Sequence, residues 1–175
     1  MTFIKHQKSR VFLALVLLAI AAAGSAKAVE AAMAARPLAG AWILVRADNV
    51  AVDGTRTMLY GPDPQGFLTF DDHGRYALQI LRVDRPKFAS GDKAKGSTEE
   101  YRAAVTGSNA HFGRYVVDPA ARTLTFHIDH ASFPNWEGTV QVRRFTLMGD
   151  HLTYVVPVPT SGAGVVGEVE WRRAD

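Results

Sequence analysis

The sequence predicts an all-β fold of about eight to ten short antiparallel strands, with one short helix. Polar and apolar residues alternate from Thr123 to Asp129, which is the period of a strand with one buried face. Turn residues such as Asp118-Pro119 and Gly149-Asp150 recur at short intervals along the chain. Regular short strands of this kind form a sandwich or a barrel, and the succession of hairpins favours an up-and-down arrangement.

The strands follow from β-rich runs bounded by turn residues. The first run is entered through Gly40, and Asp71-Asp72-His73-Gly74 is a hairpin connection. A corner at Phe133-Pro134 precedes a return strand in the central stretch. The expected strands cover residues 40–46, 56–60, 66–70, 76–83, three segments between 111 and 147 (one over 123–129 and one over 139–147), 151–156 and 165–173.

A single helix is expected to begin after Ser97. Ser97 and Glu100 have the spacing of a capping box, in which each side chain bonds the backbone amide of the other. Tyr101, Ala104 and Val105 then fall on one face, and Gly107 is a suitable end.

The N-terminus has the order of a secretory signal peptide. Basic residues open the chain, and an apolar run of about 13 residues over 11–23 leads to Ala26-Lys27-Ala28. A membrane-spanning helix needs about 20 apolar residues, so we expect no membrane anchor in the mature chain. Residues 1–28 are therefore expected to be removed by cleavage after Ala28, which places the mature protein in the periplasm or outside the cell.

Charge and cysteine content limit the partners of the remaining domain and the source of its stability. The full chain has 20 Lys and Arg residues against 17 Asp and Glu. Loss of residues 1–28 removes four basic and no acidic residues, which leaves a net charge near −1 and no support for nucleic-acid binding. Cysteine is absent, so stability must come from a hydrophobic core. We expect an N-terminal arm over 29–37 and one domain over 38–175.

A series of short motifs resembles the bacterial and fungal lipocalin-like domain family. Gly40-Ala41-Trp42 is similar to the G-x-W signature of lipocalins. The rest of the series is Tyr60-Gly61-Pro62, residues 66–70, Gly74-Arg75-Tyr76, Arg85-Pro86, Glu99-Glu100-Tyr101-Arg102, Gly113-Arg114-Tyr115, residues 133–138 and Arg143-Arg144-Phe145. The resemblance covers about residues 38–172. It implies a closed barrel of eight or slightly more strands around a cavity. We expect the helix from Ser97 to pack outside this barrel or across its mouth.

The resemblance also implies a structural role for Trp42, because the G-x-W tryptophan of lipocalins plugs the closed end of the barrel. An arginine of the last strand, here Arg172 or Arg173, is then expected to cover the indole by a cation–π contact. The alternative is that Trp42 is an ordinary core residue.

Candidate ligand-binding residues are isolated polar groups on otherwise apolar strands. An unpaired polar group buried in a barrel costs about 1 to 3 kcal/mol, so inward-facing ones imply a partner, water or ligand. The alternative for His127 and for Arg143 is a position on the outer surface. The alternative for Trp136 is a structural role, in which it seals the core beneath its corner. The candidates are Gln79, Arg82, Tyr115, His127, Asn135, Trp136 and Arg143.

These residues predict a protein that binds a small apolar or amphipathic molecule. The alternatives are a cofactor-independent isomerase or cyclase that uses His127 and Tyr115 for acid–base chemistry, and a filled barrel with a structural role. Catalytic residues remain unassigned. No metal is expected, because His127 and His130 fall on opposite faces of a strand. No cofactor is expected either, because the G-x-G-x-x-G match at 162–167 precedes a strand and not a helix.

Overall fold

The structure is a computed structural model that describes residues 37–160 and 164–174. The chain divides into two units after Leu38, and the description below is of the second unit. The predicted signal peptide over 1–28 and residues 29–36 of the predicted arm lie outside the described residues, as do residues 162 and 163 of the glycine motif.

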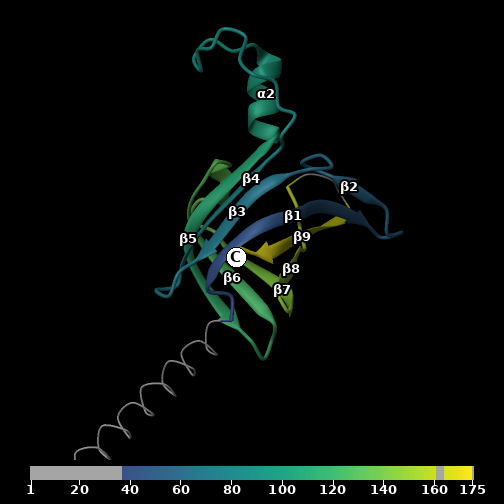
Figure 1. The fold of residues 1–175 in the computed structure, drawn as a ribbon, viewed down its shortest axis with the longest axis vertical. Helices are drawn as coiled ribbons and strands as arrows, with labels where there is room; N and C mark the ends of the chain where they lie inside the picture. The colour runs from purple at the N-terminus through teal and green to yellow at the C-terminus, as the bar shows by residue number, and fades with distance from the viewer. Residues whose placement is uncertain (1–36, 161–163, 175) are drawn as a thin grey trace, which may run out of the picture. The chain divides into compact units, whose positions relative to one another are not determined.

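The second unit is a closed, eight-stranded antiparallel barrel with one additional strand, which confirms the predicted fold class (Figure 1). The strands follow one another as neighbours from β3 to β9, and β1 closes the barrel by pairing with both β3 and β9. The strands are β1 (Gly40–Ala51), β2 (Arg56–Met58), β3 (Gln65–Phe70), β4 (Arg75–Leu81), β5 (Ser108–Asp118), β6 (Thr123–Ala131), β7 (Val140–Met148), β8 (His151–Val156) and β9 (Val165–Arg173).

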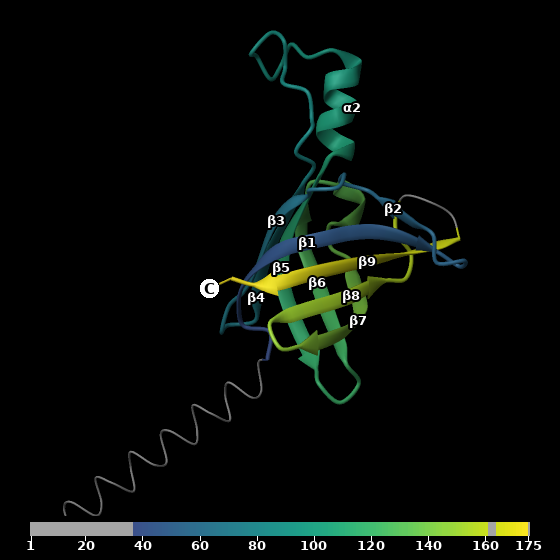
Figure 2. The same ribbon diagram turned by 45° about the vertical axis from the view of Figure 1, so that its right-hand side comes forward.

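Strand β1 is the seam of the barrel. Its first part pairs with β3, and its last part pairs with β2, while β9 runs beside it almost throughout (Figure 2). On the outer side of this seam Arg46 contacts Glu168 at 2.6 Å and Glu170 at 2.7 Å. Arg56 of β2 also contacts Glu168, at 2.8 Å. These partly exposed ion pairs link β1, β2 and β9, and networks of this kind add modestly to stability.

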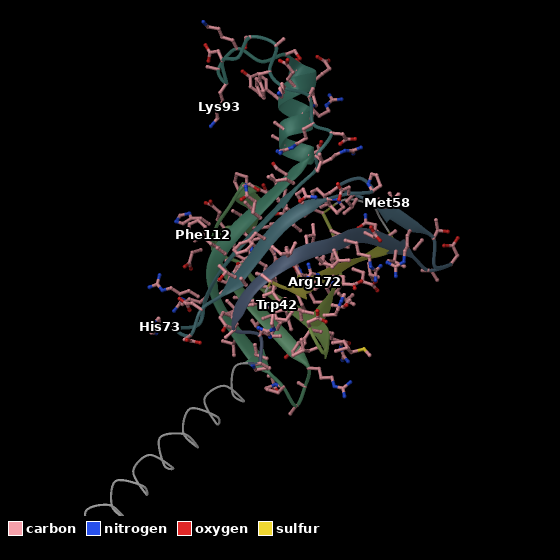
Figure 3. The ribbon with its side chains drawn as sticks, in the orientation of Figure 1. Trp42, Met58, His73, Lys93, Phe112 and Arg172 are labelled. Carbon is pink, nitrogen blue, oxygen red and sulfur yellow. The ribbon has the colours of Figure 1, made fainter. Side chains whose placement is uncertain are left out.

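One end of the barrel is plugged by Trp42, which is fully buried. The guanidinium of Arg173 lies 4.2 Å from the centroid of the Trp42 ring, and Arg173 donates a hydrogen bond of 2.7 Å to the carbonyl oxygen of Ala39. Of the two arginines considered from the sequence, Arg173 makes this contact and Arg172 is exposed. Figure 3 labels Trp42 on β1 and His73 in the turn between β3 and β4.

A bulge in the β5–β6 pairing changes which residues face inward. The register shifts between Phe112 and Gly113, so that Asp129 and His130 are both exposed. Gly113 allows this close approach, because a Cβ atom there would overlap the carbonyl oxygen of His127 and lie 2.8 Å from the amide nitrogen of Asp129.

The helix α2 (Thr98–Thr106) begins at the predicted capping box. Glu100 accepts a hydrogen bond of 2.7 Å from the amide of Ser97, whose hydroxyl accepts from the amide of Glu100. Figures 1 and 3 show α2 and the loop bearing Lys93 beyond the ends of β4 and β5. No residue of α2 is buried, and none lines the cavity of the barrel. The ring of Tyr101 packs on Phe88 of the preceding loop, with ring centroids 5.5 Å apart.

No helix within the described residues is long and apolar enough to cross a bilayer. Besides α2, the described residues include a 3₁₀ turn, η1 (Pro134–Trp136), between β6 and β7.

Candidate functional site

The barrel holds a cavity of about 360 Å³, which is lined by Ala47, Asp48 and Asn49 near the end of β1 and not by Trp42 near its start. This volume lies within the range of small-molecule sites, which is about 300 to 1,000 Å³. Its apolar lining is Ala47, Leu59, Leu78, Ile80, Phe126, Val140, Val142, Val156, Pro157, Val158, Pro159 and Val169. Its polar and aromatic lining is Asp48, Asn49, Tyr60, Asn109, His111, Trp136, Gln141, Arg143, Tyr154 and Thr160, and Gly167 completes the wall.

Strand alternation places the polar groups on the inner wall. On β7, Gln141 and Arg143 share the face that carries buried Phe145, while Arg144, between Arg143 and Phe145, is exposed. On β8, buried Tyr154 follows the same rule. The cavity therefore combines an apolar wall with a few polar groups aimed into it, the usual composition of a ligand site.

His111 on β5 is the buried histidine of the cavity. It is 8% exposed, and its ring centroid lies 5.7 Å from those of Phe126 and Trp136. The phenol oxygen of Tyr76 lies 2.8 Å from its Nδ1 atom. Burial, with a smaller effect of the nearby positive charge of Arg143, lowers the pKa of His111 to about 4. The imidazole is therefore neutral at pH 7.

Tyr76 orients this histidine. Burial raises the pKa of the Tyr76 phenol, so it keeps its proton at neutral pH. With Tyr76 as the donor to Nδ1, the ring proton of neutral His111 is on Nε2. In that tautomer the Nε2–H group of His111 is free to donate a hydrogen bond to a ligand.

Arg143 brings a positive charge to the inner wall. Its Nη2 atom donates to Oε1 of Gln141, and Nη1 donates to the carbonyl oxygen of Val142 at 3.3 Å. Burial lowers the pKa of Arg143, and Tyr154 and Tyr76 oppose this shift. Burial also raises the pKa of Tyr154 to about 12, with Trp171 and Arg143 acting in the opposite direction. Both phenols near the guanidinium are thus protonated and uncharged.

A second polar pair, Tyr60 and Asn109, lines the cavity. Burial raises the pKa of Tyr60, and a hydrogen bond with the Asn109 side chain partly offsets the shift. The Oδ1 atom of Asn109 is buried and has no hydrogen-bond partner in the part of the chain that the structure describes. An acceptor in this position is normally satisfied by water or by a donor on a ligand.

The structure brings two of the sequence-predicted candidates, Trp136 and Arg143, to the cavity wall. Gln79 and His127 are not on that wall, because each alternates with buried residues of its strand: Gln79 lies between buried Leu78 and Ile80 and faces outward. His127 holds the same outward position on β6, next to buried Phe126. Gln79 is therefore not an inward-facing residue, and for His127 the alternative of an outward position holds.

Three other candidates also lie away from the cavity. Tyr115 is buried, but its hydroxyl donates to the carbonyl oxygen of Asp71 at 2.9 Å, in the turn between β3 and β4. Arg82 follows the end of β4 and pairs with Asp84 at 2.5 Å. Asn135 is exposed in η1. The acid–base pair of His127 and Tyr115 is therefore not assembled, and the histidine that lines the cavity, His111, contacts the phenol of buried Tyr76 instead.

The sequence reasoning missed Tyr60, Tyr76, His111 and Tyr154. A signal for two of them was present, since His111 is two residues from Gly113 and four from Tyr115, which puts all three on one face of β5. Tyr76 starts the alternation that continues through Leu78 and Ile80. Among the described residues no group of three or more His, Cys, Asp and Glu side chains is arranged to hold a metal ion.

A closed eight-stranded meander with a plugged end, a stacked tryptophan–arginine pair and an internal cavity defines the lipocalin type of β-barrel. Comparison with known families agrees: the chain matches the lipocalin-like domain over residues 39–174 and belongs to that family. It is also 29% identical over 105 residues to a 4'-hydroxy-3'-methoxypropiophenone carrier protein of Aspergillus oryzae, a match that covers 55% of this chain and 95% of the relative.

Proposed function

We propose that this protein is an exported carrier that binds one small amphipathic molecule in the barrel cavity. The observation that carries the proposal is the cavity of about 360 Å³, whose wall is mostly apolar but includes Arg143, His111 and the Asn109 amide. A barrel filled by its own side chains would leave no such space. The ligand we propose has an apolar, ring-sized body and a polar end.

The similarity to a carrier protein supports binding without turnover. An aryl ketone of the kind named for the Aspergillus relative has the size and the amphipathic character that the cavity requires. The residues of the wall favour aromatic ligands, because Phe126, Trp136 and His111 present ring edges and faces to the cavity.

Acid–base chemistry is a weaker candidate. The hydrogen bond between Tyr76 and His111 resembles the base and its orienting group in an enzyme. A general base works best when its pKa lies near the operating pH, however, and the pKa of His111 is about 4. The carrier proposal therefore stands ahead of an isomerase or cyclase.

Export is proposed from the sequence of residues 1–28. Two measurements on protein from its host test the proposal. Intact-mass analysis of protein from the extracellular or periplasmic fraction should give a chain that begins after Ala28. Native mass spectrometry should give a mass greater than that of the chain alone. The excess should disappear on denaturation, when the bound small molecule is released. Protein that carries no ligand from its host and binds no aromatic titrant below about 100 μM, a threshold of roughly 5.5 kcal/mol, would count against the carrier.

A further inference from the structure

Arg143 places a positive charge on the wall of the cavity. Arg143 has no carboxylate within ion-pair distance in the described part of the chain, and its contacts with Gln141 and Val142 use two of its five N–H donors. The carboxylate that lines the same cavity, Asp48, is engaged elsewhere: it lies 3.6 Å from Arg46 and 3.4 Å from Arg56. Within the residues that the structure describes, the guanidinium of Arg143 is thus a positive charge without a carboxylate counter-ion.

The other groups near Arg143 do not neutralise it. Tyr76 and Tyr154 are protonated phenols at pH 7, and His111 is a neutral imidazole. Burying a cation among neutral groups costs free energy, and proteins retain such charges mainly where an anionic partner pairs with them. Arginine also presents a planar fork that matches a carboxylate with two parallel hydrogen bonds.

We infer that the polar end of the bound molecule is a carboxylate, which pairs with Arg143 inside the barrel between Tyr76, Tyr154 and His111. This inference rests on the proposed carrier function and names the class of ligand: a small organic acid with an apolar, aromatic-sized body. With Tyr76 as the donor to Nδ1, the Nε2–H group of His111 supplies a second donor to the same wall.

A carboxylate fits this place better than an ionised phenol. The cavity raises the pKa of a phenol, Tyr154, to about 12 in spite of the nearby guanidinium. An ordinary ligand phenol would meet the same desolvation and stay protonated. A carboxylic acid starts from an ordinary pKa of about 4.3, far enough below neutrality to stay ionised at pH 7.5 beside the guanidinium.

The test compares two ligands that share a body and differ in charge, naphthoic acid and naphthamide. The neutral fluorophore N-phenylnaphthylamine reports occupancy of the cavity, and each compound is titrated as its competitor at pH 7.5 and constant salt. We expect the acid to displace the fluorophore at a concentration at least tenfold lower than the amide. Arg143→Gln should reduce this ratio to within twofold, while Arg144→Gln, on the outer face of the same strand, should leave it unchanged.

The outcomes separate the two proposals. If the fluorophore binds but the acid and the amide compete equally in the wild type, or if Arg144→Gln removes the preference as Arg143→Gln does, the carboxylate inference is wrong and the carrier proposal stands. If neither the fluorophore nor either naphthalene compound binds, both are wrong. Should Arg143→Gln fail to fold, Arg143→Lys replaces it; retention of the charge without the planar fork should leave a preference smaller than that of the wild type, and an undiminished preference would count against the inference.

Discussion

The phenol oxygen of Tyr76 lies 2.8 Å from Nδ1 of His111, and both side chains are buried inside the barrel. Burial keeps the Tyr76 phenol protonated and the His111 imidazole neutral at pH 7. A histidine that resists protonation in the folded state makes stability depend on pH.

The first prediction concerns that dependence. The pKa of His111 is about 4 when folded and about 6.5 when unfolded, so its contribution is fully present above about pH 6.5 and is lost as the pH falls toward 4. Between pH 7.5 and pH 5 the free energy of unfolding should fall by about 2 kcal/mol from this residue. Urea unfolding at both pH values measures the loss. His111→Gln should show a loss smaller by about that amount, and an equal loss in both proteins would contradict the assignment.

A second prediction concerns the stability cost of Arg143. Because its charge is partly buried without a carboxylate partner, Arg143→Met should raise the free energy of unfolding of the ligand-free protein by about 1 kcal/mol. Arg144→Met changes an exposed residue of the same strand and should stay within about 0.5 kcal/mol of the wild type. Chemical denaturation of the three proteins side by side makes the comparison. A clear loss of stability in Arg143→Met would show that the guanidinium is a structural group.

The third prediction addresses the closed end of the barrel. Arg173→Ala removes both the contact with the Trp42 ring and the hydrogen bond to Ala39, so we expect a loss of about 1 to 2 kcal/mol. Arg172→Ala is the matched control, because Arg172 is exposed, and its effect should be below about 0.5 kcal/mol. Equal effects of the two substitutions on the urea midpoint would refute the structural role given to Arg173.

A fourth prediction follows from the bulge between β5 and β6. In Gly113→Ala the new methyl group meets the backbone of His127 and Asp129, which cannot move without disturbing the pairing, so the loss should be about 3 kcal/mol. Arg114→Ala, at the neighbouring exposed position, should cost less than about 0.5 kcal/mol. Thermal melting followed by circular dichroism distinguishes them; a melting temperature of Gly113→Ala near that of the wild type would mean that the pairing can relax.

The fold was accessible from the sequence because its signals are local. The alternation over 123–129, the hairpin turns and the capping box of Ser97 and Glu100 each act within a few residues, and the structure contains all of them. The motif series then distinguished a closed barrel from a sandwich.

The site was less accessible because it depends on which side of each strand faces inward. Gln79 and Tyr76 lie on one short strand, yet only Tyr76 points into the barrel, since they are three positions apart and the side-chain period is two. The bulge at Gly113 shifts the pairing on β6 once more. That Arg143 has no carboxylate partner among the described residues is a property of the assembled wall, which no stretch of sequence displays.

The central claim, that the cavity holds the ligand, is tested most directly by filling it. Val156 lines the cavity, whereas its neighbour Val155 does not, so Val156→Trp places an indole in the cavity and Val155→Trp places one outside it. Titration of N-phenylnaphthylamine into both variants and the wild type gives the dissociation constants. The account predicts that Val156→Trp weakens binding at least tenfold, about 1.4 kcal/mol, while Val155→Trp stays within twofold of the wild type; undiminished binding to a folded Val156→Trp protein would contradict it.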